Sequence, residues 1–277
     1  MAHSPIDFEY LRKLVFEQSG VVLEPHKDYL ADLYLDKLAS QSKFTSVAAF
    51  VEHLKTIPRD SLHTQAIEAL LISETSFFRD RYPFEALQRS VLPPLIQSRS
   101  NKRAINIWSA ACSTGQEPYS IAMLIRESFP ELSTWAIRLI ATDVSARSLE
   151  RARQGVYSDL EVNRGLAPEL RDRFFHPVGR SWQLNDDLRQ MVEFRQLNLI
   201  HSWNSLPKMD VIFLRNVLIY FNNETKQAIL NKVQGCLRDD GYLFLGSGET
   251  TFYLDARFEA IHGKACLYHR LRNRAIG

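Results

Sequence analysis

The chain has 277 residues, of which 45% are hydrophobic and 24% are charged. This length allows one large domain or two modest ones with enough apolar side chains for a core, and the composition excludes a disordered or fibrous protein. The 34 Lys and Arg residues against 32 Asp and Glu leave a net charge of +2, which is too small to indicate broad attraction to nucleic acid.

The cysteines and the first part of the chain bear on metals and on the compartment. Cys112, Cys236 and Cys266 lie too far apart for a disulfide framework, and no Cys/His cluster has metal-ligand spacing, so we predict no metal site. Charged side chains interrupt residues 1–20, and no apolar run is long enough to span a membrane. We therefore expect a cytoplasmic protein with no signal peptide and no direct membrane insertion.

The chain up to about residue 75 has the periodicity of helices. Its apolar residues recur at spacings of three and four, as in Leu11, Leu14 and Val15. Gly20 and Pro25 stand where helices stop. We predict a small all-helical N-terminal domain.

From residue 104, short apolar segments alternate with helical ones, an alternation typical of a mostly parallel sheet. The predicted strands are at 105–108, 137–142 and 211–214, and the predicted helices are at 117–128, 146–154 and 223–237. A turn at 239–241 precedes a strand at 242–245, and residues 266–269 predict a terminal strand that pairs with it antiparallel. Residues 157–196 break this rhythm with glycines and prolines, which indicates an inserted subdomain.

A loop of small side chains follows the strand at 105–108 and leads to a helix that starts near Glu117. In an open α/β sheet, ligands bind beyond the carboxyl ends of the strands. This loop has one glycine, Gly115, where a dinucleotide fingerprint has three, and the Glu117 carboxylate repels phosphate. The same charge attracts a cationic group such as the ammonium or sulfonium of S-adenosylmethionine, which the loop favours over NAD. An equally open alternative is that Glu117 caps its own helix.

Further polar residues follow predicted strands or lie at the domain junction. Asp143 is suited to accept hydrogen bonds from ribose hydroxyls, or alternatively to cap the next helix. Asn198 and Asn216 offer a donor and an acceptor to an adenine or amino-acid group, or serve as turn residues. Residues 73–80 place two aromatics beside Arg79 at a junction, which is a preferred ligand site. The alternative is that the aromatics are core and that Arg79 forms a surface ion pair with Asp80 or Glu85.

Several long motifs occur in an order that identifies a family. They are the segments 74–80, 108–120, 141–143, 155–157 and 214–221. Over nearly its whole length the chain resembles the CheR-type methyltransferases, which methylate glutamates of bacterial chemoreceptors with S-adenosylmethionine.

The resemblance implies an α/β fold in which a helical N-terminal domain, residues 1–75, precedes a Rossmann-like S-adenosylmethionine methyltransferase domain, residues 76–277. A small antiparallel β-subdomain is inserted at about 157–196. The implied reaction transfers the methyl group of S-adenosylmethionine to glutamate side-chain carboxylates in the cytoplasmic helical domain of chemoreceptors. The products are glutamate methyl esters, used in sensory adaptation, and S-adenosyl-L-homocysteine.

The resemblance also assigns roles to residues of this chain. Arg79 and Tyr220 are implied as catalytic, with Tyr220 near the transferred methyl group. Glu117 is implied to meet the amino-acid part of the cofactor and Asp143 its ribose. The implied cofactor pocket also includes Thr75, Arg79, Ala110, Gly115, Asn198, Leu199, Asn216 and Val217.

The sequence departs from the family pattern at three places. Ser73 stands where relatives usually have Asn, the helix after Pro25 is less basic than in many relatives, and the stretch 176–183 looks abbreviated. From the last difference we expect no dependence on a receptor's C-terminal tail peptide. Two other functions stay open: a carboxyl methyltransferase of a non-motility signalling receptor, and a noncatalytic S-adenosylmethionine-binding signalling module. A nucleic-acid methyltransferase is disfavoured because Arg and Lys are scattered along the chain.

Overall fold

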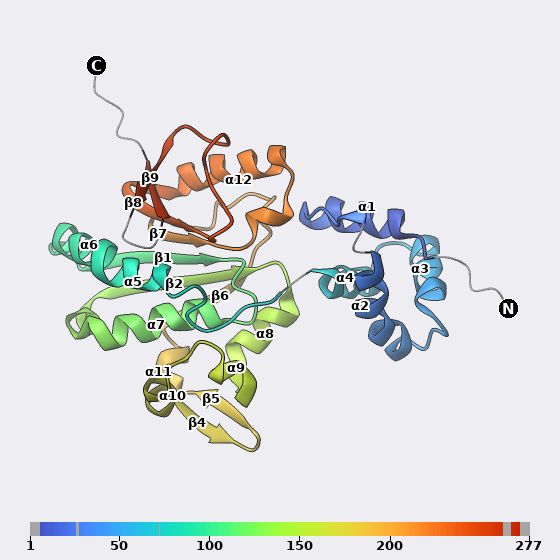
Figure 1. The fold of residues 1–277 in the computed structure, drawn as a ribbon, viewed down its shortest axis with the longest axis horizontal. Helices are drawn as coiled ribbons and strands as arrows, with labels where there is room; N and C mark the ends of the chain where they lie inside the picture. The colour runs from blue at the N-terminus through green and yellow to red at the C-terminus, as the bar shows by residue number, and fades with distance from the viewer. Residues whose placement is uncertain (1–5, 26–27, 72, 263–266, 272–277) are drawn as a thin grey trace. The chain divides into compact units, whose positions relative to one another are not determined.

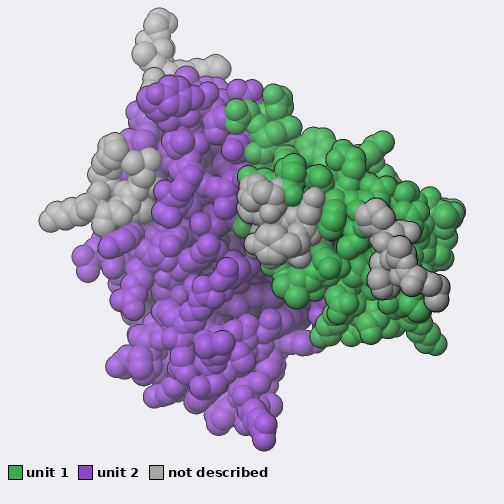
Figure 2. Space-filling model, turned by 45° about the vertical axis from the view of Figure 1, so that its right-hand side comes forward, with its two compact units in different colours: residues 1–72, 220–225 green, residues 73–219, 226–277 purple. Residues whose placement is uncertain are grey.

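The computed structural model describes residues 6–25, 28–71, 73–262 and 267–271, and Figure 1 shows its fold. The chain divides into two compact units, which Figure 2 shows in different colours. The first unit comprises Met1–Ile72 and Tyr220–Thr225, and the second comprises Ser73–Ile219 and Lys226–Gly277.

The first unit is built from amphipathic helices, which confirms the helical interpretation of this part of the chain. They are α1 (Phe8–Ser19), α2 (Asp28–Gln41), α3 (Val47–Thr56) and α4 (Ser61–Leu70). Side chains cap the N-termini of α1, α3 and α4, as where Ser46 accepts from the Ala49 N–H and Asp60 from the Leu62 N–H. Gly20 ends α1 in the left-handed conformation, with φ of 75°. The segment 220–225 joins this unit through a bridge between Val21 and Phe221.

The second unit is an α/β structure, and its elements follow in chain order. They are α5 (Tyr82–Ala86), the π-helix η2 (Leu87–Val91), α6 (Leu92–Arg99), β1 (Ala104–Ala110), α7 (Gln116–Ser128), the 3-10 helix η3 (Pro130–Thr134), β2 (Ala136–Asp143), α8 (Ala146–Gln154), β3 (Val156–Ser158), α9 (Asp159–Asn163), α10 (Pro168–Phe174), β4 (Phe175–Val178), β5 (Ser181–Leu184), α11 (Asp186–Arg189), β6 (Val192–Gln196), β7 (Met209–Leu214), the 3-10 helix η4 (Leu218–Tyr220), α12 (Asn223–Cys236), β8 (Leu237–Leu245), β9 (Phe258–His262) and β10 (Leu267–Leu271). The helix η4 ends and α12 begins in the part of the chain that belongs to the first unit.

The main sheet has the strand order β6-β2-β1-β7-β8-β10-β9. Its first five strands pair in parallel, whereas β10 pairs antiparallel with both β8 and β9. From β1 the chain moves outward to β2 and β6 on one side and to β7 and β8 on the other. The strand order therefore reverses between β1 and β7, and the carboxyl ends of those two strands are where an open α/β sheet binds ligands.

Two parts of the sheet differ from the sequence-based expectation. The segment predicted as a turn at 239–241 lies inside β8, because a bulge lets Leu237 pair with Met209 while Tyr242 pairs with Val211. The strand β6 lies in the range predicted for the insertion, yet it pairs in parallel with β2 at the edge of the main sheet. The small separate sheet has the order β3-β5-β4 and is antiparallel. The expected antiparallel pairing of the last strand with β8 is confirmed at Tyr268 and His269, while Cys266 lies outside the described residues.

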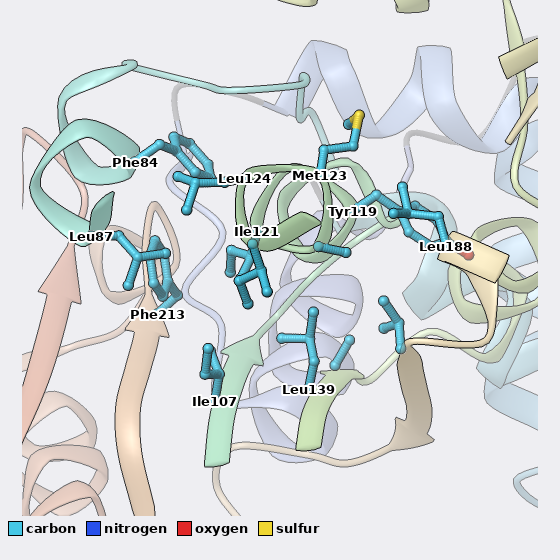
Figure 3. Close-up of a cluster of buried hydrophobic side chains, with 14 of the residues drawn as sticks. Phe84, Leu87, Ile107, Tyr119, Ile121, Met123, Leu124, Leu139, Leu188 and Phe213 are labelled. Atoms are coloured by element: carbon cyan, nitrogen blue, oxygen red, sulfur yellow. The ribbon is translucent and has the colours of Figure 1, made fainter. Parts of the chain in front are cut away.

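The core fixes the position of α7 over the sheet. In Figure 3, side chains of α7 point toward Ile107 of β1 and Leu139 of β2, with Phe84 and Phe213 beside them. Residues 118–125 of α7 are all buried, and each large apolar side chain so buried contributes roughly 1.5–3 kcal/mol. This packing holds the N-terminus of α7 at the carboxyl ends of β1 and β7.

Within the described ranges, no helix is both long and apolar enough to cross a bilayer. The same residues contain no group of three or more His, Cys, Asp or Glu side chains arranged to hold a metal ion.

Candidate functional site

The loop between β1 and α7 follows an unusual backbone path. Ala111 and Ser113 have φ angles of 53° and 51°, and Gly115 has a φ of 95°. A Cβ on Gly115 would lie 2.9 Å from the Ala152 Cβ and 3.1 Å from the Tyr157 hydroxyl oxygen. Glycine is therefore needed here both for the left-handed conformation and for the close approach of α8. The Tyr157 hydroxyl in turn donates a hydrogen bond of 2.7 Å to the Thr114 carbonyl.

Asp143, at the end of β2, fastens the same loop. Its Oδ2 accepts from the Ser113 N–H at 2.8 Å and its Oδ1 from the Ser145 N–H at 2.9 Å. The N-cap of α8 is Ser145, which accepts from the Ser148 N–H. The helix-cap alternative for Asp143 is therefore wrong. The Asp143 carboxylate therefore connects the end of β2 to the loop before α7 and to the start of α8.

Glu117 does not cap its helix either. The N-cap of α7 is Gly115, with no side-chain cap. The Glu117 carboxylate accepts from the Ser109 hydroxyl at 2.8 Å and forms an ion pair of 2.8 Å with Arg215 Nη1. Sequence reasoning named no partner for Glu117 within the chain, whereas the structure gives it a cationic one in Arg215. The remaining lone pairs are still suited to accept N–H groups from an ammonium.

Arg215 is the side chain that joins the parts of this site. It follows β7, and its side chain is 1% exposed. Besides Glu117, its Nη2 donates to the Asp80 carboxylate at 2.7 Å and to the Arg79 carbonyl at 2.9 Å. A buried guanidinium is tolerated only when it is paired and hydrogen-bonded, so these contacts hold α7, β7 and residues 79–80 together. We did not predict Arg215; the signal available was a charged residue directly after the apolar run at 211–214.

The junction segment, residues 73–81, is pinned to the second unit. The Ser73 carbonyl accepts from the Ser113 hydroxyl at 2.7 Å, and the Phe78 N–H donates to the Ser120 hydroxyl at 2.9 Å. Phe77 is fully buried, with its ring edge-on to Tyr157 at 5.0 Å. Ser73, which departs from the family pattern, thus contacts the loop between β1 and α7 through its backbone.

Arg79 lies in this segment and does not form the expected surface ion pair. Its Nη1 donates to the Glu74 carbonyl at 2.8 Å, and Asp80 is paired with Arg215 instead. Phe77 is part of the core, as predicted by the alternative in which the aromatic side chains of this segment are buried. Positive φ values at Phe78, Asp80 and Arg81 turn the segment back on itself. A cavity of about 330 Å³ opens there, lined by residues 74–81 with Arg164 and Gly165.

Glu249 is a second residue that sequence reasoning missed. Its carboxylate accepts from four backbone N–H groups: those of Asn216 and Gly246 at 2.8 and 2.7 Å through Oε2, and those of Val217 and Ile219 at 2.8 and 3.2 Å through Oε1. Asn216 has a φ of 55°, and a Cβ on Gly246 would lie 2.7–2.8 Å from Asn216 and Glu249. The carboxylate therefore fixes the loop after β7 against the end of β8.

The structure brings most of the predicted residues to one edge of the sheet. Ala110, Gly115 and Glu117 follow or end β1, Asp143 ends β2, Asn198 and Leu199 follow β6, and Asn216 and Val217 follow β7. These four strands are neighbours in the order β6-β2-β1-β7. Thr75 and Arg79 lie on the pinned junction segment. Tyr220 belongs to the first unit, where its carbonyl accepts from the Val22 N–H at 2.8 Å.

Comparison with known proteins gives a consistent result. Residues 73–267 match the family described as CheR methyltransferase, SAM binding domain. The chain is 39% identical to chemotaxis protein methyltransferase 1 of Pseudomonas aeruginosa, over 98% of this chain and 100% of that one. It is 38% identical to chemotaxis protein methyltransferase Cher2 of Pseudomonas putida, over 94% and 96% of the two chains.

Among solved structures, a TehB-like SAM-dependent methyltransferase from Corynebacterium glutamicum matches 70% of this chain and 95% of its own, at 12% identity and a TM-score of 0.38. A TM-score of 0.38 is too low to support a fold assignment, so the assignment depends on the strand order and the family match.

Proposed function

Because the chain belongs to the CheR methyltransferase family, we propose that it transfers the methyl group of S-adenosylmethionine to glutamate carboxylates of chemoreceptors. One observation carries the proposal. The residues assigned to the cofactor lie at the carboxyl ends of adjacent parallel strands around the point where the strand order reverses. Arg79, which we propose orients the acceptor carboxylate, is connected to the same edge of the sheet because Arg215 donates a hydrogen bond to its carbonyl.

The residues at this edge fit S-adenosylmethionine chemically. Glu117 keeps acceptor capacity for an ammonium. Asp143, at the end of β2, carries a carboxylate, which is the group that accepts hydrogen bonds from ribose hydroxyls. Gly115 adds no side chain to the loop between β1 and α7, which is the loop proposed to face the ligand. Ala110, Asn198, Leu199, Asn216 and Val217 complete the pocket, and Thr75 and Arg79 adjoin it. When bound, S-adenosylmethionine supplies a methyl group activated by the positive sulfonium.

The chain's own contribution to the reaction is to bring together and align two charged reactants. An acceptor glutamate with a pKa of about 4.3 is already an anion near neutral pH, so no general base is needed. Alignment of well-oriented reactants contributes at most roughly 7–11 kcal/mol. Arg79 uses one N–H group on the Glu74 carbonyl, and its other donors orient the acceptor carboxylate without neutralising it fully. Tyr220 acts near the transferred methyl group.

The test is the transfer of labelled methyl groups from S-adenosylmethionine to a cytoplasmic fragment of a chemoreceptor. Mild alkali hydrolyses methyl esters to volatile methanol and leaves N-methyl groups intact. Volatile label is the expected result. Alkali-stable label would overturn the acceptor chemistry, and cofactor binding without any transfer would favour the noncatalytic signalling module.

Two variants separate binding from catalysis. Arg79→Ala is expected to keep cofactor affinity, measured by calorimetry, and to lose most of the turnover. Asp143→Ala is expected to weaken cofactor binding, because it removes the ribose acceptor and also loosens the Ser113 backbone. Arg89→Ala, on an exposed face of η2, is the control and should change neither quantity. Unchanged turnover in Arg79→Ala would remove Arg79 from the mechanism.

We also propose that the protein acts in the cytoplasm on the helical domain of the receptor, independently of a receptor tail peptide. The shortness of the β4–β5 hairpin, with two residues between the strands, supports this. Receptor fragments with and without the tail are expected to be methylated at equal rates. A strong dependence on the tail would contradict this part of the proposal.

A further inference from the structure

The cavity beside Arg79 carries more positive charge than the reaction of one carboxylate needs. Its wall holds the guanidinium groups of Arg79, Arg81 and Arg164 and the carboxylates of Glu74 and Asp80. Three arginines thus face two carboxylates, and Asp80 is in addition paired with the buried Arg215, at 2.7 Å. Within the described part of the chain, the cavity wall is therefore positive overall, which suits an anionic ligand.

Arg164 is occupied by a side chain of this same chain. Its Nη2 lies 2.7 Å from Glu74 Oε1, and the two side chains are 59% and 63% exposed. The hydrogen bond from Arg164 is the main cause that holds the pKa of Glu74 below its usual value. Exposed ion pairs contribute about 0–1 kcal/mol. An incoming carboxylate therefore meets little resistance when it replaces Glu74.

The position of Arg164 is built into the fold rather than left to a flexible surface chain. The next residue, Gly165, has a φ of 92°, and a Cβ there would lie 2.1 Å from the Phe77 carbonyl oxygen. Phe77 itself is fully buried and packs edge-on against Tyr157 and Phe175. The backbone at 164–165 is thus seated directly on the junction segment that carries Arg79.

We propose that Arg164 is a binding residue for an acidic side chain of the acceptor segment, and that Glu74 occupies it until the acceptor binds. The identity of the acceptor rests on the function proposed above. Glu74 has the same functional group as the proposed acceptor side chains, so the exchange replaces one carboxylate with another and needs no new chemistry. Arg79 orients the reacting carboxylate, and Arg164 holds the acceptor beside it.

The proposal predicts opposite changes in affinity for the acceptor when Arg164 and Glu74 are replaced. If the pair only braces the cavity wall, Glu74→Gln and Arg164→Gln break the same contact and have similar effects. If Arg164 binds the acceptor, Arg164→Gln weakens binding of an acidic receptor fragment about fivefold, while Glu74→Gln removes the competitor and tightens it about two- to fivefold. Both differences should shrink as salt screens the charges.

The measurement is the Kd of a fluorescent receptor cytoplasmic fragment, with the Kd of S-adenosylmethionine measured in parallel. The control is the exposed pair Arg173 and Glu127, with 2.7 Å between N and O, whose Gln variants should leave the fragment Kd unchanged. Shifts in the same direction for Glu74→Gln and Arg164→Gln, or no shifts, would overturn the inference.

Failure of the proposed function has a different signature. Opposite Kd shifts without transfer of volatile label would contradict the proposed reaction and leave Arg164 as a binding residue. Volatile label with equal Kd values in all variants would contradict only the role of Arg164. A wild-type protein that binds no fragment while transferring label to another protein would overturn the inference for this acceptor.

Discussion

Glu249→Gln perturbs the loop after β7 with little change in side-chain size. The carboxylate accepts from four backbone N–H groups, two through each oxygen. Glutamine keeps one oxygen and replaces the other with an NH₂ group, which is a donor. Two of the four N–H groups therefore lose their acceptor and face a second donor.

The size of the effect follows from those two donors. A buried donor left without an acceptor costs about 1–3 kcal/mol. Because Glu249 is half-buried, water can reach part of the loop, and the lower end of that range applies. We expect the variant to lose about 2 kcal/mol of unfolding free energy, which corresponds to a Tm lower by about 4–8 °C for a unit of this size. Since Asn216 and Val217 belong to the proposed cofactor pocket, S-adenosylmethionine should bind about tenfold more weakly.

Thermal unfolding and calorimetry of cofactor binding measure the two effects. Glu259→Gln, on an exposed position of β9, is the matched control for removing one negative charge. Glu249→Asp is informative as well, because the shorter side chain keeps the charge and cannot reach all four N–H groups. A Glu249→Gln protein with unchanged Tm and unchanged cofactor affinity would refute the argument that this carboxylate organises the loop.

Three further predictions concern other residues of the second unit. Arg215→Lys keeps the charge and loses the fork that joins three partners, so denaturant unfolding should show a loss of about 2 kcal/mol, with weaker cofactor binding. Gly165→Ala should cost well over 1 kcal/mol and more than Gly179→Ala, because both have positive φ but only the first brings a Cβ against a carbonyl. Burial lowers the pKa of His269 to about 4, whereas the pKa of an unfolded histidine is about 6.5. Between these two values the unfolded state binds more protons than the folded state, so the free energy of unfolding should fall by about 3 kcal/mol as the pH drops from 6.5 to 4. The His269→Gln variant should lack this pH-dependent loss of stability.

Much of the fold could be predicted because the central strands are buried on both faces. The runs at 105–108, 137–142 and 211–214 are mostly apolar for that reason, and they correspond to β1, β2 and β7. Edge strands give a weaker signal: β6 is buried only in part and alternates like a strand of a small insertion. The helices between 82 and 99 were also missed. Their prolines, Pro83 and Pro93, stand in first turns, where the missing N–H has no partner to lose.

The candidate site could be predicted only in part, because local patterns do not contain long-range partners. A polar residue within two positions of the end of a predicted strand is visible in the sequence, which is how Asp143 and Asn216 were found. The partner of Glu117 lies 98 residues away at Arg215, and that of Asn216 lies 33 residues away at Glu249. Which carboxylate meets which donor depends on strand order, and no spacing in the sequence specifies it.

The charges at this edge of the sheet differ in how firmly they are held, and that difference bears on the reaction. Asp143 and Glu249 bind backbone N–H groups, and Glu117 is paired with a buried arginine. These carboxylates are held in place, so the proposed cofactor site around them needs no rearrangement on binding, which is the condition for electrostatic preorganisation. Glu74 is paired through exposed side chains and can leave. A site that joins a cation to an anion needs both kinds of acid: fixed ones for the reactant that must be held, and a displaceable one where the second reactant must enter.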